Sequence, residues 1–326
     1  MGSNLNRVLL TDPIAPAGEQ ALARAAEVVR APDSRPETIR QLASEADGII
    51  TRSKLPDDIF SAAPRVRAVA VHGTGTDLVP VAEATARGVM VANLPGVNAE
   101  SAAEYCAMAM LMLARNVLSI VGTLKSEGWD NARALGSSVH EIAGMTLGIV
   151  GVGEIGSRLA KICASGFGMQ VLGHQRRLDR LPPQACPATL EELVKASDFI
   201  VLACPLTAET HHLFNGKMLS LMKPSAWLIN IGRGAVIHEE ALVGALRAKR
   251  IAGAMLDVYE HYRLAPGHPL LALDNVILTP HLAAVTQESR ARASIAAAEE
   301  MLRMLAGQRP QNFVNPESWE KIYSKP

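Results

Sequence analysis

Two side chains in this sequence could bind and protonate a carbonyl compound. Arg233 follows the apolar segment LINIG, and His281 follows the segment NVILTP. An arginine can hold a carboxylate with two hydrogen bonds while it polarises a neighbouring carbonyl. A histidine, which titrates near neutral pH, can supply the proton that carbonyl reduction by hydride requires. Taken singly, each residue is equally compatible with a structural role, but their shared position after apolar segments favours a reductase site.

A glycine-rich segment upstream supplies a candidate cofactor loop. The residues GVGEIG place Gly151, Gly153 and Gly156 in the spacing G-x-G-x-x-G, directly after the apolar TLGIV and before the helical SRLAKICASGF. In this context the glycines make a tight turn, admit a pyrophosphate and let the helix pack on the strand. The start of the helix then offers free N–H groups to the phosphates. The alternative is a glycine-rich turn that binds no ligand.

The end of the next predicted strand, MQVLG, carries no acidic residue. The chain continues with His174, Gln175, Arg176 and Arg177. An acid there would bind the ribose of NADH, whereas arginines accommodate the 2′-phosphate of NADPH. The sequence therefore favours NADPH over NADH, although the two arginines could instead cover a solvated loop.

The elements that must position these residues alternate between short strands and amphipathic helices. The first part of the chain has the strand candidates RVLL, GII near 48, VRAVAV near 66 and VMVA near 89. Six more follow, namely MTLGIVG, MQVLG, DFIVLAC, AWLINIG, IAGAMLD and NVILTPH. This alternation predicts two doubly wound parallel-sheet α/β domains. We expect a flavodoxin-like substrate domain from residues 1–100 and 287–326, and a Rossmann dinucleotide-binding domain from residues 101–286.

Composition limits the class of protein. The 326 residues suit two domains, and 32 basic residues balance 32 acidic ones without a basic run, which argues against nucleic acid or an anionic membrane as partner. The apolar stretch YCAMAMLMLAR is too short to span a bilayer, and the N-terminus shows no export signal. We therefore expect a cytoplasmic protein. The four cysteines and nine histidines have no metal-ligand spacing, so no metal is expected.

Six segments resemble the D-isomer-specific 2-hydroxyacid dehydrogenase family. They are VHGTGTDLVPVAEATARGVMVANLPGVNAESAAEY, TLGIVGVGEIGSRLA, PLTAETHHLF, LINIGRGAVIHEEAL, GAMLDVYE and HPLLALDNVILTPH, in the family's order. The resemblance implies that Arg233 binds and polarises the substrate, that His281 is the general acid or base, and that the amides of Thr74 and Gly75 hold the substrate carboxylate. It also implies cofactor contacts from the following residues: Glu154, Ile155, Gln175, Arg176, Arg177, Cys204, Pro205, Ile231 and Asp257. Loops around Lys54 and His72 are expected to determine which side group of the substrate the enzyme accepts.

One position departs from the family pattern. Similar enzymes keep a glutamate hydrogen-bonded to the catalytic histidine, and in this chain Tyr262 occupies that place in DVYEHYR. A tyrosine can orient an imidazole but is neutral at pH 7, so it stabilises the imidazolium less than a carboxylate does. Tyr262 therefore either orients His281, or lines the pocket, or packs as an ordinary aromatic side chain.

The interpretation that follows is an NADPH-dependent 2-oxoacid reductase similar to glyoxylate and hydroxypyruvate reductases. One alternative is a dinucleotide-sensing protein related to corepressors of the same fold, and another is a family dehydrogenase acting on a small acid such as formate. The segment NAESAAEYCAMAMLMLAR is apolar over more of its circumference than one core face needs, which predicts a homodimer. A helix buried between domains would explain the same pattern.

Overall fold

The structure is a computed structural model that describes residues 5–323, and it contains two compact units. Unit 1 comprises the described residues of Met1–Asn98 and Thr286–Pro326, and unit 2 comprises Ala99–Val285. Unit 1 is thus built from two separate segments of the chain, whereas unit 2 is continuous.

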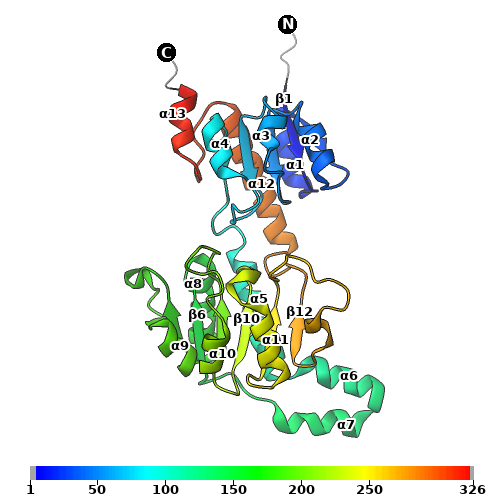
Figure 1. Cartoon of the computed structure of the whole chain (residues 1–326), viewed down its shortest axis with the longest axis vertical. Helices are drawn as coiled ribbons and strands as arrows, with labels where there is room; N and C mark the ends of the chain where they lie inside the picture. The colour runs from blue at the N-terminus through cyan, green and yellow to red at the C-terminus, as the bar shows by residue number, and fades with distance from the viewer. Residues whose placement is uncertain (1–4, 324–326) are drawn as a thin grey trace. The chain divides into compact units, whose positions relative to one another are not determined.

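Unit 1 contains a five-stranded parallel sheet in the order β2-β1-β3-β4-β5 (Figure 1). Its elements are β1 (Asn6–Leu10), α1 (Pro16–Ala23), β2 (Ala26–Arg30), α2 (Pro36–Ala43), β3 (Gly48–Thr51), α3 (Ile59–Ala62), β4 (Ala68–Val71), α4 (Val81–Arg87), β5 (Met90–Ala92), α12 (Gln287–Leu305) and α13 (Glu317–Tyr323). This strand order is that of flavodoxin-like sheets. The edge strand β2 was not predicted, because its segment AEVVR carries charged, exposed residues.

Alternate strand residues in unit 1 face two different helical layers. Val8 and Leu10 of β1 pack with residues of α1 and α12, whereas Leu9 packs with residues of α2 and α3. Gly48 lets α12 approach β3, since a Cβ there would lie 2.4 Å from the sulfur of Met301. The chain that follows α12 joins the same unit, because Phe313 forms a bridge with Ala92.

Unit 2 contains a seven-stranded parallel sheet in the order β12-β11-β10-β9-β6-β7-β8. Its strands are β6 (Thr146–Val150), β7 (Gln170–His174), β8 (Cys186–Pro187), β9 (Phe199–Leu202), β10 (Trp227–Asn230), β11 (Gly253–Leu256) and β12 (Val276–Leu278). Its helices are α5 (Ala99–Ala114), α6 (Val117–Glu127), α7 (Trp129–Ala134), α8 (Glu154–Lys161), α9 (Leu190–Ala196), α10 (Gly216–Leu221) and α11 (Glu239–Arg247). A π-helical turn, Ile162–Gly166, continues α8, and short 3-10 turns lie at Leu135–Ser138, Leu178–Arg180, Gly234–Val236 and Pro269–Ala272.

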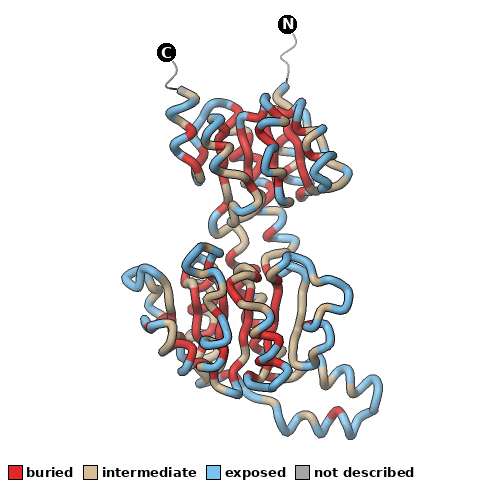
Figure 2. Tube along the Cα trace, in the orientation of Figure 1, coloured by how far each residue is buried: buried red, intermediate tan, exposed pale blue. Residues whose placement is uncertain are grey.

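Helices cover both faces of the second sheet. Ile149, Val201 and Ile229 pack with α5 and α8, while Leu202 and Leu228 pack with α9, α10 and α11. Figure 2 shows the central strands of this unit as mostly buried and β12 as intermediate, with exposed segments in the surrounding helices and loops. The prediction of two doubly wound parallel-sheet domains is confirmed, and the small edge strand β8 is an addition to the six strands predicted here.

Helices α5, α6 and α7 follow one another along the chain in unit 2. No side chain of α6 is buried, and Figure 1 shows α6 and α7 extending away from the sheet as a hairpin. Among residues 5–323, no single helix has the length and apolarity to cross a membrane. The pair Ala99–Ala114 and Val117–Glu127, bent by 51°, passes that test only when its two helices are taken together, by length and composition alone.

Candidate active site

The predicted chemical residues of unit 2 lie along one edge of its sheet. All seven strands are parallel, so their carboxyl ends share this edge, which is where open α/β sheets bind ligands. The register aligns Leu278, Leu256, Asn230, Leu202 and Val150 as neighbours across five adjacent strands. The segments that follow these strand ends therefore lie in the order His281, Asp257 to Tyr262, Arg233, Cys204 and the glycine loop.

The glycine loop has the geometry of a dinucleotide-binding turn. Gly151 has a φ of +93°, which favours glycine, and a Cβ on Gly156 would lie 2.7 Å from the carbonyl oxygen of Gly151. A Cβ on Gly153, by contrast, would meet no atom within 4 Å, so open space lies above this residue. Within residues 5–323, the N–H groups of Glu154 and Ile155 at the start of α8 donate to no protein acceptor. The loop thus fits a pyrophosphate.

The Cys204 segment packs tightly against this loop, and the Gly232 segment packs against Cys204 in turn. A Cβ on Gly151 would lie 2.6 Å from the nitrogen of Cys204, and one on Gly232 would lie 2.7 Å from the oxygen of Cys204. Burial raises the pKa of the Cys204 thiol to about 11, so it stays protonated at neutral pH. Pro205 accepts a hydrogen bond from the hydroxyl of Thr210, 2.7 Å away. Ile231 is half-buried, and its N–H donates to Leu202.

The segment after β7 is open to solvent. The side chains of Arg176 and Arg177 are exposed, and neither forms an ion pair in the described part of the chain. The amide of Gln175 donates to the carbonyl of Arg177 at 2.8 Å and shapes the loop. The pKa of nearby Glu209 is lowered, first by the hydroxyl of Thr207 and to a smaller extent by Arg176. Two cations therefore remain available to a ligand here.

Asn230 shapes the turn that carries Arg233. Asn230 is fully buried at the end of β10, where its side chain accepts from the N–H of Gly232 at 3.1 Å and donates to the carbonyl of Arg233 at 3.1 Å. The guanidinium of Arg233 donates to the carbonyl of Gly232 at 2.9 Å. Gly234 contacts the next segment so closely that a Cβ would lie 1.9 Å from the carbonyl carbon of Tyr259. The turn that carries Arg233 is thus held by the Asn230 side chain on one side and by the backbone of Tyr259 on the other.

Asp257 holds the turn that carries His281. Its buried carboxylate accepts from the N–H of Leu282 at 2.7 Å, from the N–H of Ala283 at 2.8 Å and from the hydroxyl of Thr279 at 2.6 Å. Its carbonyl accepts from the N–H of His281 at 2.9 Å. The resemblance implied a contact of Asp257 with the cofactor, and that role stays a prediction. In the structure its oxygens are engaged in fixing His281.

Tyr262 faces His281 edge to face. The two ring centroids are 6.1 Å apart, with the ring planes at 74°. The N–H of Tyr262 donates to the carbonyl of Tyr259 at 3.1 Å, which closes a turn, and 65% of Tyr262 is exposed. It is therefore not a core aromatic. Glu260, the nearest acid in this segment, bonds instead to His212, with 2.7 Å between Oε1 and Nε2.

The residues predicted to bind the substrate in unit 1 gather after β3 and β4. Lys54 is exposed and lies 3.8 Å from Asp57. The hydroxyl of Thr74 donates to Leu94 at 3.1 Å. Among residues 5–323, the backbone N–H groups of Thr74 and Gly75 donate to no protein acceptor. These two amides could therefore hold a carboxylate.

His72 has a packing role within unit 1. Its Nε2 lies 2.8 Å from the hydroxyl oxygen of Ser294 on α12, and this hydroxyl lies 2.6 Å from the carbonyl of Arg290. Because a serine has one hydrogen to donate, the arrangement assigns the donor role to Nε2 of His72. Burial, followed by the charge of Arg52, lowers the pKa of His72 to about 4. The imidazole is therefore neutral at pH 7.

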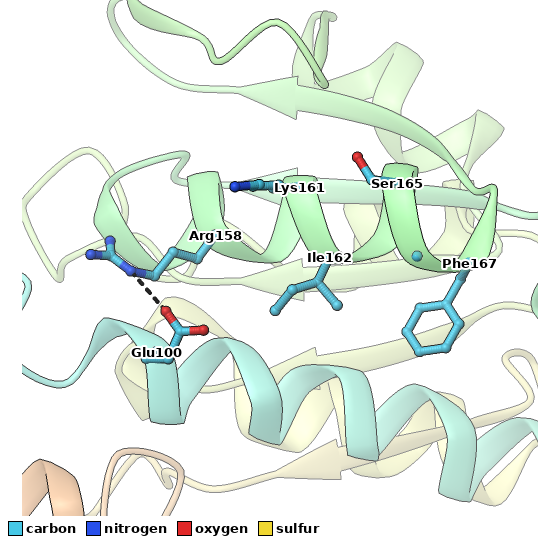
Figure 3. Close-up of a pocket in the computed structure, with 7 residues that line it drawn as sticks. Glu100, Arg158, Lys161, Ile162, Ser165 and Phe167 are labelled. Atoms are coloured by element: carbon cyan, nitrogen blue, oxygen red, sulfur yellow. Dashed lines mark ion pairs between the residues drawn. The ribbon is translucent and has the colours of Figure 1, made fainter.

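A separate cavity of about 610 Å³ lies on unit 2 beside α8 (Figure 3). It is lined by Glu100, Arg158, Lys161, Ile162, Ser165, Gly166 and Phe167. Arg158 and Glu100 point toward each other and form an ion pair at 3.3 Å (Figure 3). None of the predicted site residues lines this cavity. Within the described residues, no group of His, Cys, Asp and Glu is placed to hold a metal ion.

Two positioning contacts were missed from the sequence. Asn230 could have been noticed as a polar residue that ends an otherwise apolar strand. The pairing of Glu260 with His212 gave no such signal, because 48 residues separate them.

Comparisons with known proteins agree with this geometry. The sequence model of the D-isomer specific 2-hydroxyacid dehydrogenase NAD-binding domain matches residues 107–283. A glyoxylate reductase of Aeropyrum pernix is 41% identical over 293 residues, which is 86% of this chain and 86% of that protein. The NADPH-dependent glyoxylate/hydroxypyruvate reductase of Sinorhizobium meliloti, solved with NADP and malonate, is 30% identical with a TM-score of 0.84, covering 97% of this chain and 98% of that one. An NAD-dependent formate dehydrogenase of Staphylococcus aureus, solved with NAD, is 25% identical with a TM-score of 0.84, covering 95% and 99% of the two chains.

A Rossmann sheet with a dinucleotide loop, an arginine and a histidine along its carboxyl edge defines an oxidoreductase that uses a nicotinamide cofactor. The chain belongs to the D-isomer specific 2-hydroxyacid dehydrogenase family. It is an NAD(P)-dependent enzyme with a small-molecule substrate.

Proposed function

We propose that the enzyme reduces small 2-oxoacids with NADPH, as a glyoxylate or hydroxypyruvate reductase. The observation that carries the proposal is the alignment of the glycine loop, Arg233 and His281 along one sheet edge. The names of the glyoxylate reductase of Aeropyrum pernix and the glyoxylate/hydroxypyruvate reductase of Sinorhizobium meliloti support this substrate class.

Each chemical task has a candidate residue. A bound nicotinamide dinucleotide supplies the hydride. Arg233 binds the substrate carboxylate and polarises its carbonyl. In unit 1, the amides of Thr74 and Gly75 offer two N–H donors to a carboxylate. His281 gives a proton to the carbonyl oxygen, and Tyr262 orients the imidazole. Glu154, Ile155, Gln175, Cys204, Pro205 and Ile231 contact the cofactor.

The preference for NADPH rests on the segment after β7. Residues 175–178, which follow this strand directly, include no acid, and the side chains of Arg176 and Arg177 are exposed without an ion pair in the described part of the chain. A 2′-phosphate can take charge-assisted hydrogen bonds from both. A ribose without that phosphate finds no carboxylate partner here.

The proposal of a homodimer is based on exposed apolar side chains of α5, α6 and α7. These side chains are Met108, Leu111, Val117, Leu118, Val121, Leu124 and Trp129. All seven fall within residues 108–129, whereas surface apolar residues elsewhere in a protein are commonly isolated. A second copy of the chain that packs the same helices against them would bury these side chains around a two-fold axis.

An absorbance assay of NADPH and NADH consumption with a panel of 2-oxoacids tests the function. We expect glyoxylate or hydroxypyruvate to be reduced faster with NADPH, and an Arg233→Gln enzyme, tested as the inactive control, to show no such rate. Oxidation of formate with NAD or NADP would identify a formate dehydrogenase instead. Binding of NADPH without turnover of any of these acids would indicate a dinucleotide-sensing protein.

A further inference from the structure

Two glutamates and three histidines form a cluster at the start of α11. The N–H of Glu239 donates to the carboxylate of Glu260 at 3.2 Å, and the N–H of Glu260 donates to the carboxylate of Glu239 at 3.2 Å. His212 lies 2.7 Å from Glu260, and His268 lies 3.0 Å from Glu239. The ring of His238 lies 4.8 Å from that of His212, between centroids. None of these side chains takes part in the reaction proposed above.

The cluster joins three chain segments that meet beside the candidate site. The N–H of His212 donates to the carbonyl of Ala235 at 2.8 Å, two residues after Arg233. Glu239 begins α11, which follows the Arg233 turn. Glu260 and His268 lie in the segment 257–268, which also contains Tyr262 and is called here the Tyr262 loop. One hydrogen-bonded group thus connects the Arg233 turn to the Tyr262 loop.

Glu260 lies at the centre of this connection. The hydrogen bond from Tyr262 to Tyr259 closes a four-residue turn in which Glu260 is the second residue. A Cβ on Gly234 would lie 2.4 Å from the nitrogen of Glu260, so the two backbones are in direct contact next to Arg233. Holding Glu260 in place therefore limits the movement of both Arg233 and Tyr262.

The charges around Glu260 favour its ionised form. Burial opposes ionisation, but the hydrogen bonds from His212 and from the backbone of Glu239, with the charges of His212 and His261, lower the pKa of Glu260 overall. His211 stacks on His212 with 3.9 Å between ring centroids. Near pH 7 a carboxylate at position 260 therefore accepts hydrogen bonds from both His212 and Glu239.

We propose that Glu260 and His212 are positioning residues for the reductase reaction, because their hydrogen bond clamps the Tyr262 loop to the Arg233 turn. Glu260 touches neither reacting atoms nor cofactor in this scheme, and it acts through the placement of Tyr262 and Arg233. The inference rests on the proposed function, since the positioning matters only if these two residues act on a 2-oxoacid. Small displacements of such residues can cost about a hundredfold in rate.

Kinetics of variants test this role. We expect Glu260→Ala and His212→Ala each to lower kcat by about tenfold to a hundredfold while the KM for NADPH stays unchanged. The double variant should have a kcat no lower than that of the more impaired single variant, because both changes break the same bond. His212→Gln keeps an N–H donor and should recover most of kcat. Glu192→Ala, which removes the capping box at Thr189 of α9, is the matched control and should lower stability without lowering kcat.

Trypsin supplies a readout that needs no activity. Arg263 is exposed in the Tyr262 loop, so we expect faster cleavage after Arg263 in Glu260→Ala than in the wild type or in Glu192→Ala. Equal cleavage rates would overturn the clamp. A Glu260→Ala enzyme with normal kcat would overturn the positioning role even if its stability fell. A wild-type protein that reduces no 2-oxoacid, yet shows the cleavage difference, would refute the proposed function and with it the kinetic role, but not the clamp.

Discussion

The ring of Tyr262 stands at 74° to the ring of His281, with 6.1 Å between their centroids. Both residues adopt a left-handed backbone, with φ values of 63° and 59°. Non-glycine residues rarely adopt this conformation, and where they do it is often at functional sites. The two side chains are thus brought together by two segments with left-handed backbone that follow the neighbouring strands β11 and β12.

Replacing Tyr262 tests whether its hydroxyl takes part in proton transfer. Tyr262→Phe keeps the ring contact and loses the hydroxyl, so we expect a lower kcat for 2-oxoacid reduction with a smaller change in KM. Tyr262→Glu introduces a carboxylate that stabilises the imidazolium of His281, so the alkaline fall in rate should move to higher pH. Rates and pH profiles of the two variants measure this. If the phenylalanine variant matches the wild type in both, Tyr262 acts through packing or specificity alone.

Replacing both Arg176 and Arg177 by alanine tests the choice of cofactor. Each charge-assisted bond to a phosphate contributes about 1.5–3 kcal/mol, so we expect kcat/KM for NADPH to fall tenfold or more and that for NADH to change little. Steady-state kinetics with both cofactors make the comparison. Equal losses with NADPH and NADH would mean that the two arginines do not bind the 2′-phosphate.

The glycine loop offers a contrast between binding and stability. An alanine at Gly153 meets no protein atom within 4 Å, so Gly153→Ala should fold normally but weaken NADPH binding by blocking the phosphate. Gly151→Ala places a Cβ 2.6 Å from the nitrogen of Cys204 at a φ of +93°, and should cost on the order of 1–3 kcal/mol of stability. Thermal unfolding and titration with NADPH separate the two effects. Normal NADPH affinity in Gly153→Ala would show that the phosphates lie elsewhere.

A charge on α6 tests the dimer. Leu118 and Val121 are 52% and 42% exposed, and a double change to glutamate should produce a monomer if a second copy covers them. Ile295→Glu, on the exposed face of α12, is the matched control and should leave the mass unchanged. Light scattering at micromolar concentration measures the mass. A monomeric wild type would contradict the prediction directly.

Neutral His72 makes unit 1 sensitive to acid. Its pKa is about 4 in the folded chain against 6.5 for a free imidazole, so between these values the unfolded chain binds the proton more strongly. Stability should therefore fall as pH decreases from 6.5 to 4, by on the order of 3 kcal/mol in total. His72→Gln keeps a donor to Ser294 and cannot titrate, so it should lose this part of the pH dependence. Denaturant midpoints at pH 7, 6, 5 and 4 compare the two proteins.

The sequence by itself determined the fold class and the local context of the site. Apolar segments of strand length, each followed by a polar or glycine-rich stretch, indicated that the glycine loop, Arg233 and His281 follow strands. Since parallel strands end at one edge, this pattern also implied that these residues lie on the same side of a sheet. The edge strands were not predicted because β2 carries charged, exposed residues and β8 has only two residues, both exposed, and their pairing depends on a neighbouring strand rather than on their own residues.

The tertiary structure alone decided which groups hold the side chains proposed to be catalytic. Asp257 binds the His281 turn over 25 residues, and Glu260 bonds to His212 over 48 residues. The spacing of apolar residues in the sequence does not reveal such contacts, because they form only after packing has placed separate strands side by side. The same reason explains Tyr262: its type and position were visible in the sequence, but only the left-handed turn at its backbone directs the ring toward His281.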